Sequence, residues 1–327
     1  MKQRWMKSLL VVLFLLAALI VALYWPIHYR PPVNARPAAG YEEAESRIAR
    51  LLATDEAAPL YPGCASRFLG HGRKVERAIV LLHGYRNCPK QYQQLAASLF
   101  EAGYNVLIPR MPHMGLADVM TADQANLRAD ELAAYTTEAV DIAQGLGDEV
   151  TVAGISTGGI LTGWVAHTRA DVDRAVLIAP VFGLYAVPAP LTTPVVRLFL
   201  SLPNFLLWQD AELKAEVPNP PHVYPQNSTR AIAEILRLSF AVQALAGTAK
   251  PAVSSIYVIT NANDDAVDNR ITETVMANWR SQGVANLEHY QFEASLALDH
   301  DLLDPEHPKQ RIDVAYPILI DLINGKK

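Results

Sequence analysis

The sequence predicts an α/β fold with a mostly parallel sheet, helices on both faces, an inserted segment and an N-terminal transmembrane helix. Short apolar runs alternate with amphipathic stretches along the body of the chain, and one Pro-rich, aromatic-rich segment interrupts them. A long uncharged run precedes the body. Strands that are apolar throughout are typical of a parallel sheet covered on both faces, and the alternation is typical of repeated βαβ units.

The N-terminal segment, residues 1–30, is expected to be a membrane anchor. Every residue from Leu9 to Trp25 is apolar, and no charge occurs between Lys7 and Arg30. At about 1.5 Å per residue, that uncharged span reaches roughly 33 Å, enough to cross a hydrocarbon core about 30 Å thick. The alternative is a cleaved signal peptide, whose apolar region usually runs for about 7 to 15 residues.

Basic residues around this segment indicate its orientation. Three of them, Lys2, Arg4 and Lys7, precede it, whereas Arg30 and Arg36 follow it, which favours a cytoplasmic N-terminus. We therefore expect a single-pass protein of the cell (inner) membrane with an extracytoplasmic, periplasmic body.

Two cysteines, Cys64 and Cys88, are present. In an oxidising compartment they can form one disulfide, and the alternative is two unrelated buried thiols. No Cys/His cluster indicates a metal, and no motif indicates a cofactor. The 28 basic and 33 acidic residues give a formal charge of −5, which argues against a nucleic-acid partner. The sequence leaves the oligomeric state open.

The body divides into a connecting region and one α/β domain. Residues 31–60 hold a linker and a helix over Tyr41 to Asp55, where acidic residues come early and an apolar stripe follows. In the domain, residues 61–327, the expected strands are the apolar runs Ala78 to Leu82, Tyr104 to Pro109, Val150 to Ala153, Arg174 to Ile178, Ser254 to Thr260 and Leu287 to Phe292. The expected helices are Lys90 to Ala102, Leu127 to Leu146, Gly158 to about Arg169, Ile271 to Gln282 and Arg311 to Ile323.

An insertion interrupts this pattern at about residues 181–228, where no strand is obvious. Its apolar side chains are expected either to pack on the sheet or to form a pocket for an acyl chain. They are Phe182, Leu184, Tyr185, Val195, Val196, Leu198, Phe199, Leu200, Phe205, Leu206, Leu207 and Trp208.

A Gly-x-Ser-x-Gly motif, Gly154 to Gly158, lies between an expected strand and an expected helix. Small residues on both sides of Ser156 let the backbone turn sharply, so that the hydroxyl stands above the sheet edge. A serine needs a histidine to take its proton and a carboxylate to orient that histidine. Acidic residues of a turn follow the strand Ser254 to Thr260, and His300 follows the last strand. The order Ser, Asp, His, each just past a strand, is the one that this geometry requires.

With these residues the chain resembles the α/β-hydrolase superfamily, in the branch of carboxylesterases and monoacylglycerol lipases. The resemblance covers roughly residues 77–324 and includes the His83-Gly84 pair after the first of these strands. It implies the α/β-hydrolase fold with the insertion at about residues 181–228 as its cap. It also implies Ser156 as nucleophile, His300 as general base and then acid, and Asp264 as the orienting carboxylate. It also implies an oxyanion hole formed by the backbone amides of Tyr85 and Thr157.

Several neighbouring residues compete for these roles. Asp265 and Asp268 lie in the same turn as Asp264, and the family's usual spacing to an aliphatic residue selects Asp264, with Asp265 next. His289 lies inside an expected strand and His307 lies farther along the chain, so His300 is preferred.

Two further histidines are given supporting roles. His83 is expected to support the oxyanion loop, and His113 to be structural or to line the pocket. A segment from Arg110 to Gly115 stands where the family's lipases often carry an Asp-x-x-Gly-x-Gly loop. This departure leaves the lipase preference open.

The function predicted is a membrane-anchored serine hydrolase that cleaves carboxylic esters through an acyl-enzyme on Ser156. An acyl-chain ester such as a monoacylglycerol or lysophospholipid is the expected substrate, because the chain is tethered to a bilayer. The alternatives are a thioesterase, peptidase or acyltransferase with the same triad, or a non-catalytic, membrane-tethered binding protein.

Overall fold

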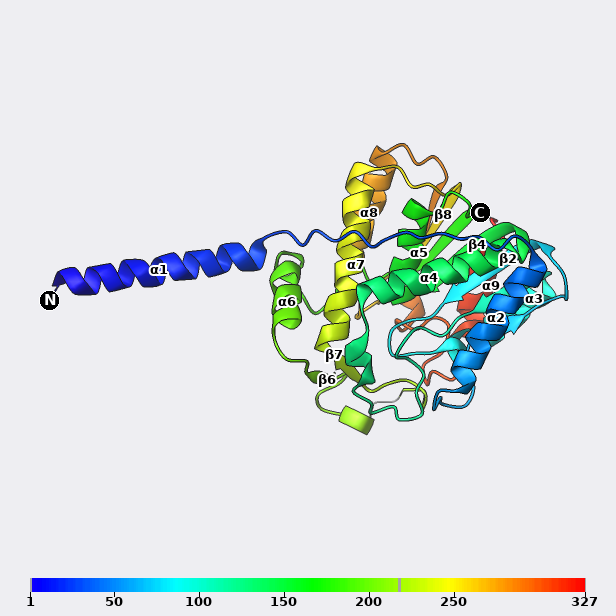
Figure 1. Ribbon diagram of the computed structural model, residues 1–327, viewed down its shortest axis with the longest axis horizontal. Helices are drawn as coiled ribbons and strands as arrows, with labels where there is room; N and C mark the ends of the chain where they lie inside the picture. Colours follow the sequence, from blue (N-terminus) through cyan, green and yellow to red (C-terminus); the bar gives the residue numbers. More distant parts are fainter. Residues whose placement is uncertain (1, 217–218, 327) are drawn as a thin grey trace.

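The computed structural model describes residues 2–216 and 219–326, and it has helices on both faces of a central sheet (Figure 1). In the described residues, seven strands form this sheet in the order β1-β3-β2-β4-β5-β8-β9. β1 runs antiparallel to β3, and the other neighbours are parallel. The strands are β1 (Arg67–Leu69), β2 (Val75–Leu82), β3 (Tyr104–Ile108), β4 (Gly147–Ile155), β5 (Arg174–Ile178), β8 (Ser255–Asn261) and β9 (Leu287–Phe292).

The sheet confirms the predicted α/β fold. All six predicted strands are present, and β4 is extended at both ends because its neighbours β2 and β5 pair with it along most of its length. Strand β1, which has three residues and lies at the edge of the sheet, was not predicted. Its side chains are only partly buried, so it lacks the apolar run that marks the other strands.

The helices divide into two layers. Leu132 in α4, Trp164 in α5 and Met276 in α8 belong to one core cluster with one face of the sheet, whereas Leu99 in α3 and Leu319 in α9 belong to the cluster on the other. The helices of the body are α2 (Tyr41–Glu56), α3 (Gln93–Glu101), α4 (Ala129–Gln144), α5 (Thr157–Thr168), α6 (Ala189–Ser201), α7 (Thr229–Thr248), α8 (Asn269–Ser281) and α9 (Ile312–Ile323).

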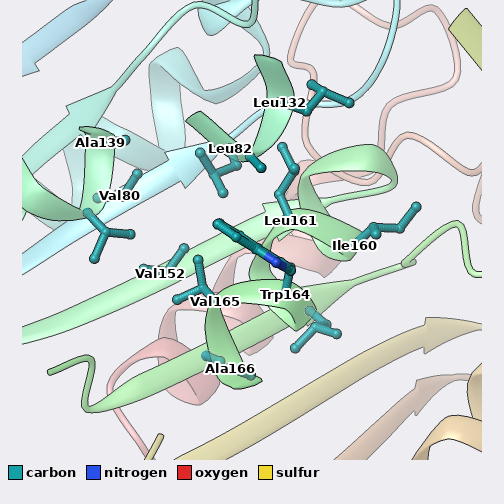
Figure 2. Close-up of a cluster of buried hydrophobic side chains, with 14 of the residues drawn as sticks. Val80, Leu82, Leu132, Ala139, Val152, Ile160, Leu161, Trp164, Val165 and Ala166 are labelled. Carbon is teal, nitrogen blue, oxygen red and sulfur yellow. The ribbon is translucent and has the colours of Figure 1, made fainter. Parts of the chain in front are cut away.

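Helix α5 is the centre of the first layer. Figure 2 shows the Trp164 ring among the apolar side chains of Leu82, Val152 and Leu161. Trp164 is almost completely buried, and both flanks of α5 contact the core, which is why this helix is apolar all round. The helix that begins at the predicted nucleophile is therefore firmly packed against β4 and β5.

Helix α1 (Lys2–Tyr24) extends away from the body (Figure 1). Its segment Trp5–Tyr24 is long and apolar enough to cross a membrane, and its side chains are exposed. The linker after it packs on α4, where the Arg36 amide donates to Asp141 Oδ2 at 2.7 Å. A second helix, α7, is also long and apolar enough to cross a membrane. More than half of the residues in its most apolar stretch are buried, however, as in the core helix of a globular domain.

The insertion contains more regular structure than its sequence indicated. Besides α6, it holds the two short antiparallel strands β6 (Leu206–Trp208) and β7 (Gln226–Ser228), so the expectation of no strand was wrong. Three-residue strands carry too short a pattern to be found by periodicity. The sequence analysis also missed α7, which begins where Ser228 accepts a hydrogen bond from the Ala231 amide as an N-cap.

Candidate active site

Ser156 lies at the sharp turn between β4 and α5. Its backbone has φ of 57° and ψ of −111°, a conformation that side-chain-bearing residues rarely adopt, and its amide donates to Ile178 O at 2.9 Å. Ser156 is partly exposed, whereas the residues on either side of it are buried. The turn therefore presents the hydroxyl to solvent while its backbone is fixed in the core.

Two glycines of the motif make this turn sterically feasible. A Cβ on Gly154 would lie 2.2 Å from Gly158 O, and a Cβ on Gly158 would lie 1.9 Å from Leu82 O. Both distances are far below van der Waals contact. The close approach of α5 to β2 and β4 therefore needs glycine at both positions.

His300 and Asp264 meet at the carboxyl edge of the sheet. His300 Nδ1 lies 2.7 Å from Asp264 Oδ2, although 36 residues separate them in the chain. The Asp264 side chain is fully buried, and its Oδ1 accepts hydrogen bonds from the Ala266 and Val267 amides, both at 3.0 Å. Because the two backbone amides hold Oδ1 in place, Oδ2 has a fixed position and orients the imidazole of His300.

The charges of this pair shift both pKa values. Burial raises the pKa of Asp264, but the charge of His300 and the hydrogen bonds outweigh it and hold that pKa below its usual value. Burial lowers the pKa of His300, but Asp264, together with Asp301 and Asp299, outweighs it and raises that pKa above its usual value. The site thus favours an ionised carboxylate next to an imidazole that readily accepts a proton.

None of the competing acids and histidines takes part in the contact between His300 and Asp264. Asp265 is exposed, and Asp268 caps α8 by accepting from the Arg270 amide at 3.0 Å. His289 bonds to Thr260 Oγ1 at 2.9 Å within the sheet. His307, which the sequence analysis set aside, lines the cavity in front of Ser156.

The loop after β2 carries the first predicted oxyanion donor. His83 is fully buried: its Nε2 accepts from the Met111 amide at 2.9 Å, so its Nδ1 carries the proton and donates to Gly84 O. Burial lowers the pKa of His83 to about 4, which keeps the ring neutral. His83 thus joins this loop to the segment Arg110 to Gly115, as a supporting residue would.

Neither of the two predicted oxyanion amides is used by a backbone hydrogen bond within the described residues. The Tyr85 amide has no hydrogen-bond partner within the described residues, and Thr157 is the first residue of α5, where an amide has no partner inside the helix. The backbone at Gly84 is near the serine, because a Cβ placed there would lie 3.7 Å from Ser156 Cβ. The Tyr85 hydroxyl accepts from the Ser228 amide at 2.9 Å, which ties this loop to the start of α7.

A disulfide joins Cys64 to Cys88. Cys88 lies three residues after Tyr85, so the bridge fixes the far end of the oxyanion loop to the segment before β1.

His113, which was expected to be structural or to line the pocket, bonds to Asp123 at 2.8 Å and to Glu131 at 3.1 Å. It is absent from the described lining of the cavity next to Ser156.

A cavity of about 500 Å³ opens in front of Ser156 and His300. Its lining contains apolar and polar residues. The apolar ones, called the apolar wall below, include Val181, Leu184, Ala186, Val267 and three residues from one face of α7, Ile232, Ile235 and Leu236. The polar ones, called the polar wall below, include Arg86, Asn87, Gln91, Gln209, Asn219, Asn227, Asp265, Asp299, Asp301 and His307.

The apolar wall differs from the expectation for the insertion. Of the twelve apolar side chains named there, Leu184 alone belongs to the described lining. Phe182 and Val196 are fully buried, whereas Phe205 and Leu207 are about half exposed. The sequence analysis missed the contribution of α7 because that helix lies beyond the insertion.

Within the described residues, no group of three or more His, Cys, Asp or Glu side chains is arranged to hold a metal ion.

A family model described as the alpha/beta hydrolase family matches residues 79–313. The chain belongs to this family. Both the match and the fold support a hydrolase, and the matched span includes the serine turn, the Asp264 turn and the His300 loop.

Solved structures with the same fold include several lipolytic enzymes. One described as LipS and LipT, metagenome-derived lipolytic enzymes, has a TM-score of 0.59 at 19% identity and covers 81% of this chain and 99% of its own. A monoacylglycerol lipase of Paleococcus ferrophilus has 0.58 at 15%, with 81% and 98% covered. A soluble variant of the Saccharomyces cerevisiae monoglyceride lipase has 0.55 at 13%, with 81% and 92% covered. No curated protein matches the sequence.

Proposed function

We propose that the protein is a membrane-anchored serine hydrolase that cleaves carboxylic esters through an acyl-enzyme on Ser156. The observation that carries this proposal is the buried contact of Asp264 with His300 beside the strained turn that exposes Ser156. Ser156 and His300 line the same cavity. This arrangement has the parts of a nucleophile, a base and an orienting acid.

In the proposed reaction, His300 takes the proton of the Ser156 hydroxyl while the oxygen attacks the ester carbonyl. The carbonyl oxygen gains a negative charge, which the amides of Tyr85 and Thr157 stabilise; such a donor contributes about 3 to 4 kcal/mol. His300 then gives the proton to the leaving alcohol. Water, activated by His300, cleaves the acyl-enzyme and restores the serine. Asp264 stays ionised and stabilises the imidazolium.

The two walls of the cavity favour an amphipathic ester. An acyl chain can lie along the apolar wall that Ile232, Ile235 and Leu236 form on α7. The alcohol part can bond to the polar wall, for example to Gln209 and Asn227 of the insertion. A monoacylglycerol or a lysophospholipid has both parts, and a cavity of this size suits a ligand of moderate length.

Membrane attachment through residues 1–30 would bring this cavity near lipid, with residues 31–60 as the connection and residues 61–327 as the catalytic domain. Helix α6 of the cap insertion lies beside the end of α1, and Arg197 donates to Trp25 O at 2.9 Å (Figure 1). Exposed apolar side chains follow in the same insertion, among them Leu202 and Phe205. A cap that faces the bilayer of the anchor would explain their exposure. We propose that the body is extracytoplasmic.

The nucleophile is tested with a fluorophosphonate probe on the full chain in detergent. The wild-type protein should be labelled, and Ser156→Ala should abolish labelling. Ser98→Ala, which removes a serine on the outer surface of α3, is the matched control and should label normally. If Ser156→Ala still labels, the proposed nucleophile is wrong.

The substrate class is tested with p-nitrophenyl esters from acetate to laurate. We expect kcat/KM to rise with chain length until the apolar wall is filled. A larger side chain at its centre, Ile235→Trp, should shift the optimum to shorter chains. If kcat/KM falls steadily from acetate onward, the cavity does not hold an acyl chain.

A further inference from the structure

Gln91 lies between the two loops of the proposed site. It belongs to the 3-10 turn η1 (Pro89–Tyr92), is only 3% exposed and lines the cavity. Its Oε1 accepts from the Gly84 amide at 2.9 Å, and its Nε2 donates to Asp301 Oδ2 at 2.8 Å. The side-chain amide of Gln91 therefore accepts a hydrogen bond from the loop that holds Gly84 and donates one to the loop that holds Asp301.

Each partner of Gln91 is directly next to a proposed catalytic group. Gly84 precedes Tyr85, the proposed oxyanion donor, and Asp301 follows His300, the proposed base. Gln91 and Asp301 are 210 residues apart in the chain. The distance between the oxyanion amide and the base is thus determined partly by this one side chain.

Asp301 is a fixed anchor for this link. Its Oδ1 accepts from the Leu303 and Asp304 amides, both at 3.0 Å, and its Oδ2 also accepts from Asn87 Nδ2 at 3.2 Å. Burial, together with the charge of Asp304, raises the pKa of Asp301. Asp301 is only partly exposed and accepts four hydrogen bonds, so turning the Gln91 amide would place its oxygen against the carboxylate.

We propose that Gln91 is a positioning residue for ester hydrolysis, which holds the Gly84-Tyr85 backbone at a fixed place relative to His300. The inference rests on the proposed function. Gln91 acts through its two neighbours. A shift of the Gly84 backbone changes where the Tyr85 amide meets the developing oxyanion, and this stabilisation depends on distances of about 3 Å. Loss of the link therefore weakens transition-state binding more than substrate binding.

The first test is Gln91→Met, which keeps the length of the side chain but removes both hydrogen bonds. We expect kcat for a p-nitrophenyl ester to fall by about 10- to 100-fold, because misplacement by about 1 Å costs up to about 10²-fold. KM should change by less than about twofold, since the apolar wall that binds the acyl chain is untouched. Rates are divided by the folded fraction, measured by circular dichroism.

The second test is Gln91→Glu, which separates a positioning role from a purely structural one. When protonated, the new carboxyl group can accept from Gly84 and donate to Asp301, as the amide does. When ionised, it repels the Asp301 carboxylate. We expect the ratio of the variant's kcat to that of the wild type to fall at least about tenfold between about pH 6 and about pH 9. The charged or titratable groups nearest Asp301 are Asp304, His300, Arg86, Tyr92 and Tyr316.

The matched control is Asn105→Leu. Asn105 is another fully buried amide with a partner at each end, His71 and Leu146, but it lies near the start of β3 and is not in the described lining of the cavity. This variant should lose stability while keeping kcat per folded molecule.

The outcomes separate this inference from the proposed function. Two results overturn the positioning role alone, provided that the wild type is active. One is an unchanged kcat in Gln91→Met, and the other is a ratio of the Gln91→Glu kcat to the wild-type kcat that does not change with pH. A wild type that neither reacts with fluorophosphonate nor hydrolyses any ester overturns the proposed function, and the inference with it. A fall in kcat with the expected pH dependence supports the positioning role.

Discussion

Replacing Asp264 by Asn tests the proposed orientation of His300 most directly. Oδ1 of Asp264 accepts from two backbone amides, those of Ala266 and Val267, and Oδ2 lies 2.7 Å from His300 Nδ1. In Asp264→Asn the carbonyl oxygen must keep the position next to the two amides, because an NH₂ group there would meet two donors. The new NH₂ group therefore faces His300 Nδ1.

This geometry imposes the wrong tautomer on the histidine. To accept from the NH₂ group, Nδ1 must lose its proton, and Nε2 then carries the proton and cannot take another from Ser156. The change from a correct to an incorrect tautomer in such a triad costs about 10⁴-fold in kcat, or about 5 kcal/mol of transition-state stabilisation. KM should stay nearly constant, since Asp264 is absent from the cavity lining in the described residues.

The assay is ester hydrolysis as a function of pH, with Asp265→Asn as the control. Asp265 is exposed in the same turn and lines the cavity, but it is not among the carboxylates that raise the pKa of His300, so its replacement should change KM while leaving kcat within about twofold of the wild type. Activity needs a neutral His300, and the Asp264 carboxylate raises the pKa of that histidine. The acid limb of the residual activity of Asp264→Asn should therefore move to lower pH. A loss smaller than about tenfold, together with a large loss in Asp265→Asn, would refute the assignment of the acid.

Three further predictions concern stability and the serine turn. Replacing both Cys64 and Cys88 by Ser should lower the free energy of unfolding by about 3 kcal/mol in urea titrations without reductant, given the 24-residue separation; equal stability in both proteins would argue against the bridge. Gly158→Ala should reduce both the melting temperature and kcat, because the new Cβ meets Leu82 O. Gly247→Ala in α7 should instead stabilise by up to about 1 kcal/mol, because the new Cβ would lie at an ordinary contact distance of 3.9 Å from the Asn278 side chain. Asp141→Ala should cost about 1 to 3 kcal/mol in the same titration, because it removes the buried ion pair with Arg169 at 2.7 Å and the acceptor of the Arg36 amide, whereas Asp171 still pairs with Arg169.

The sequence was sufficient for those parts of the fold that depend on local pattern. Six strands and the helices of the body other than α6 and α7 were predicted, because each has an apolar run or stripe of ordinary length. The rule that the carboxyl ends of parallel strands lie at a common edge pointed to Ser156, to the acidic turn after β8 and to His300, whereas the choice of Asp264 within that turn came from the family resemblance. Strands β1, β6 and β7 escaped notice because three residues carry no readable period.

Contacts between residues that are far apart in the chain could not be predicted from the sequence. Gln91 has no motif around it, and only the folded structure reveals that its amide joins Gly84 to Asp301. The apolar wall is a similar case, since Ile235 on α7 lines the cavity while most of the insertion's apolar residues are buried elsewhere or exposed. Both depend on how loops and helices pack across the sheet edge. A catalytic motif can therefore be located by spacing, but the groups that hold its parts at working distance, and those that select the substrate, must be found from packing.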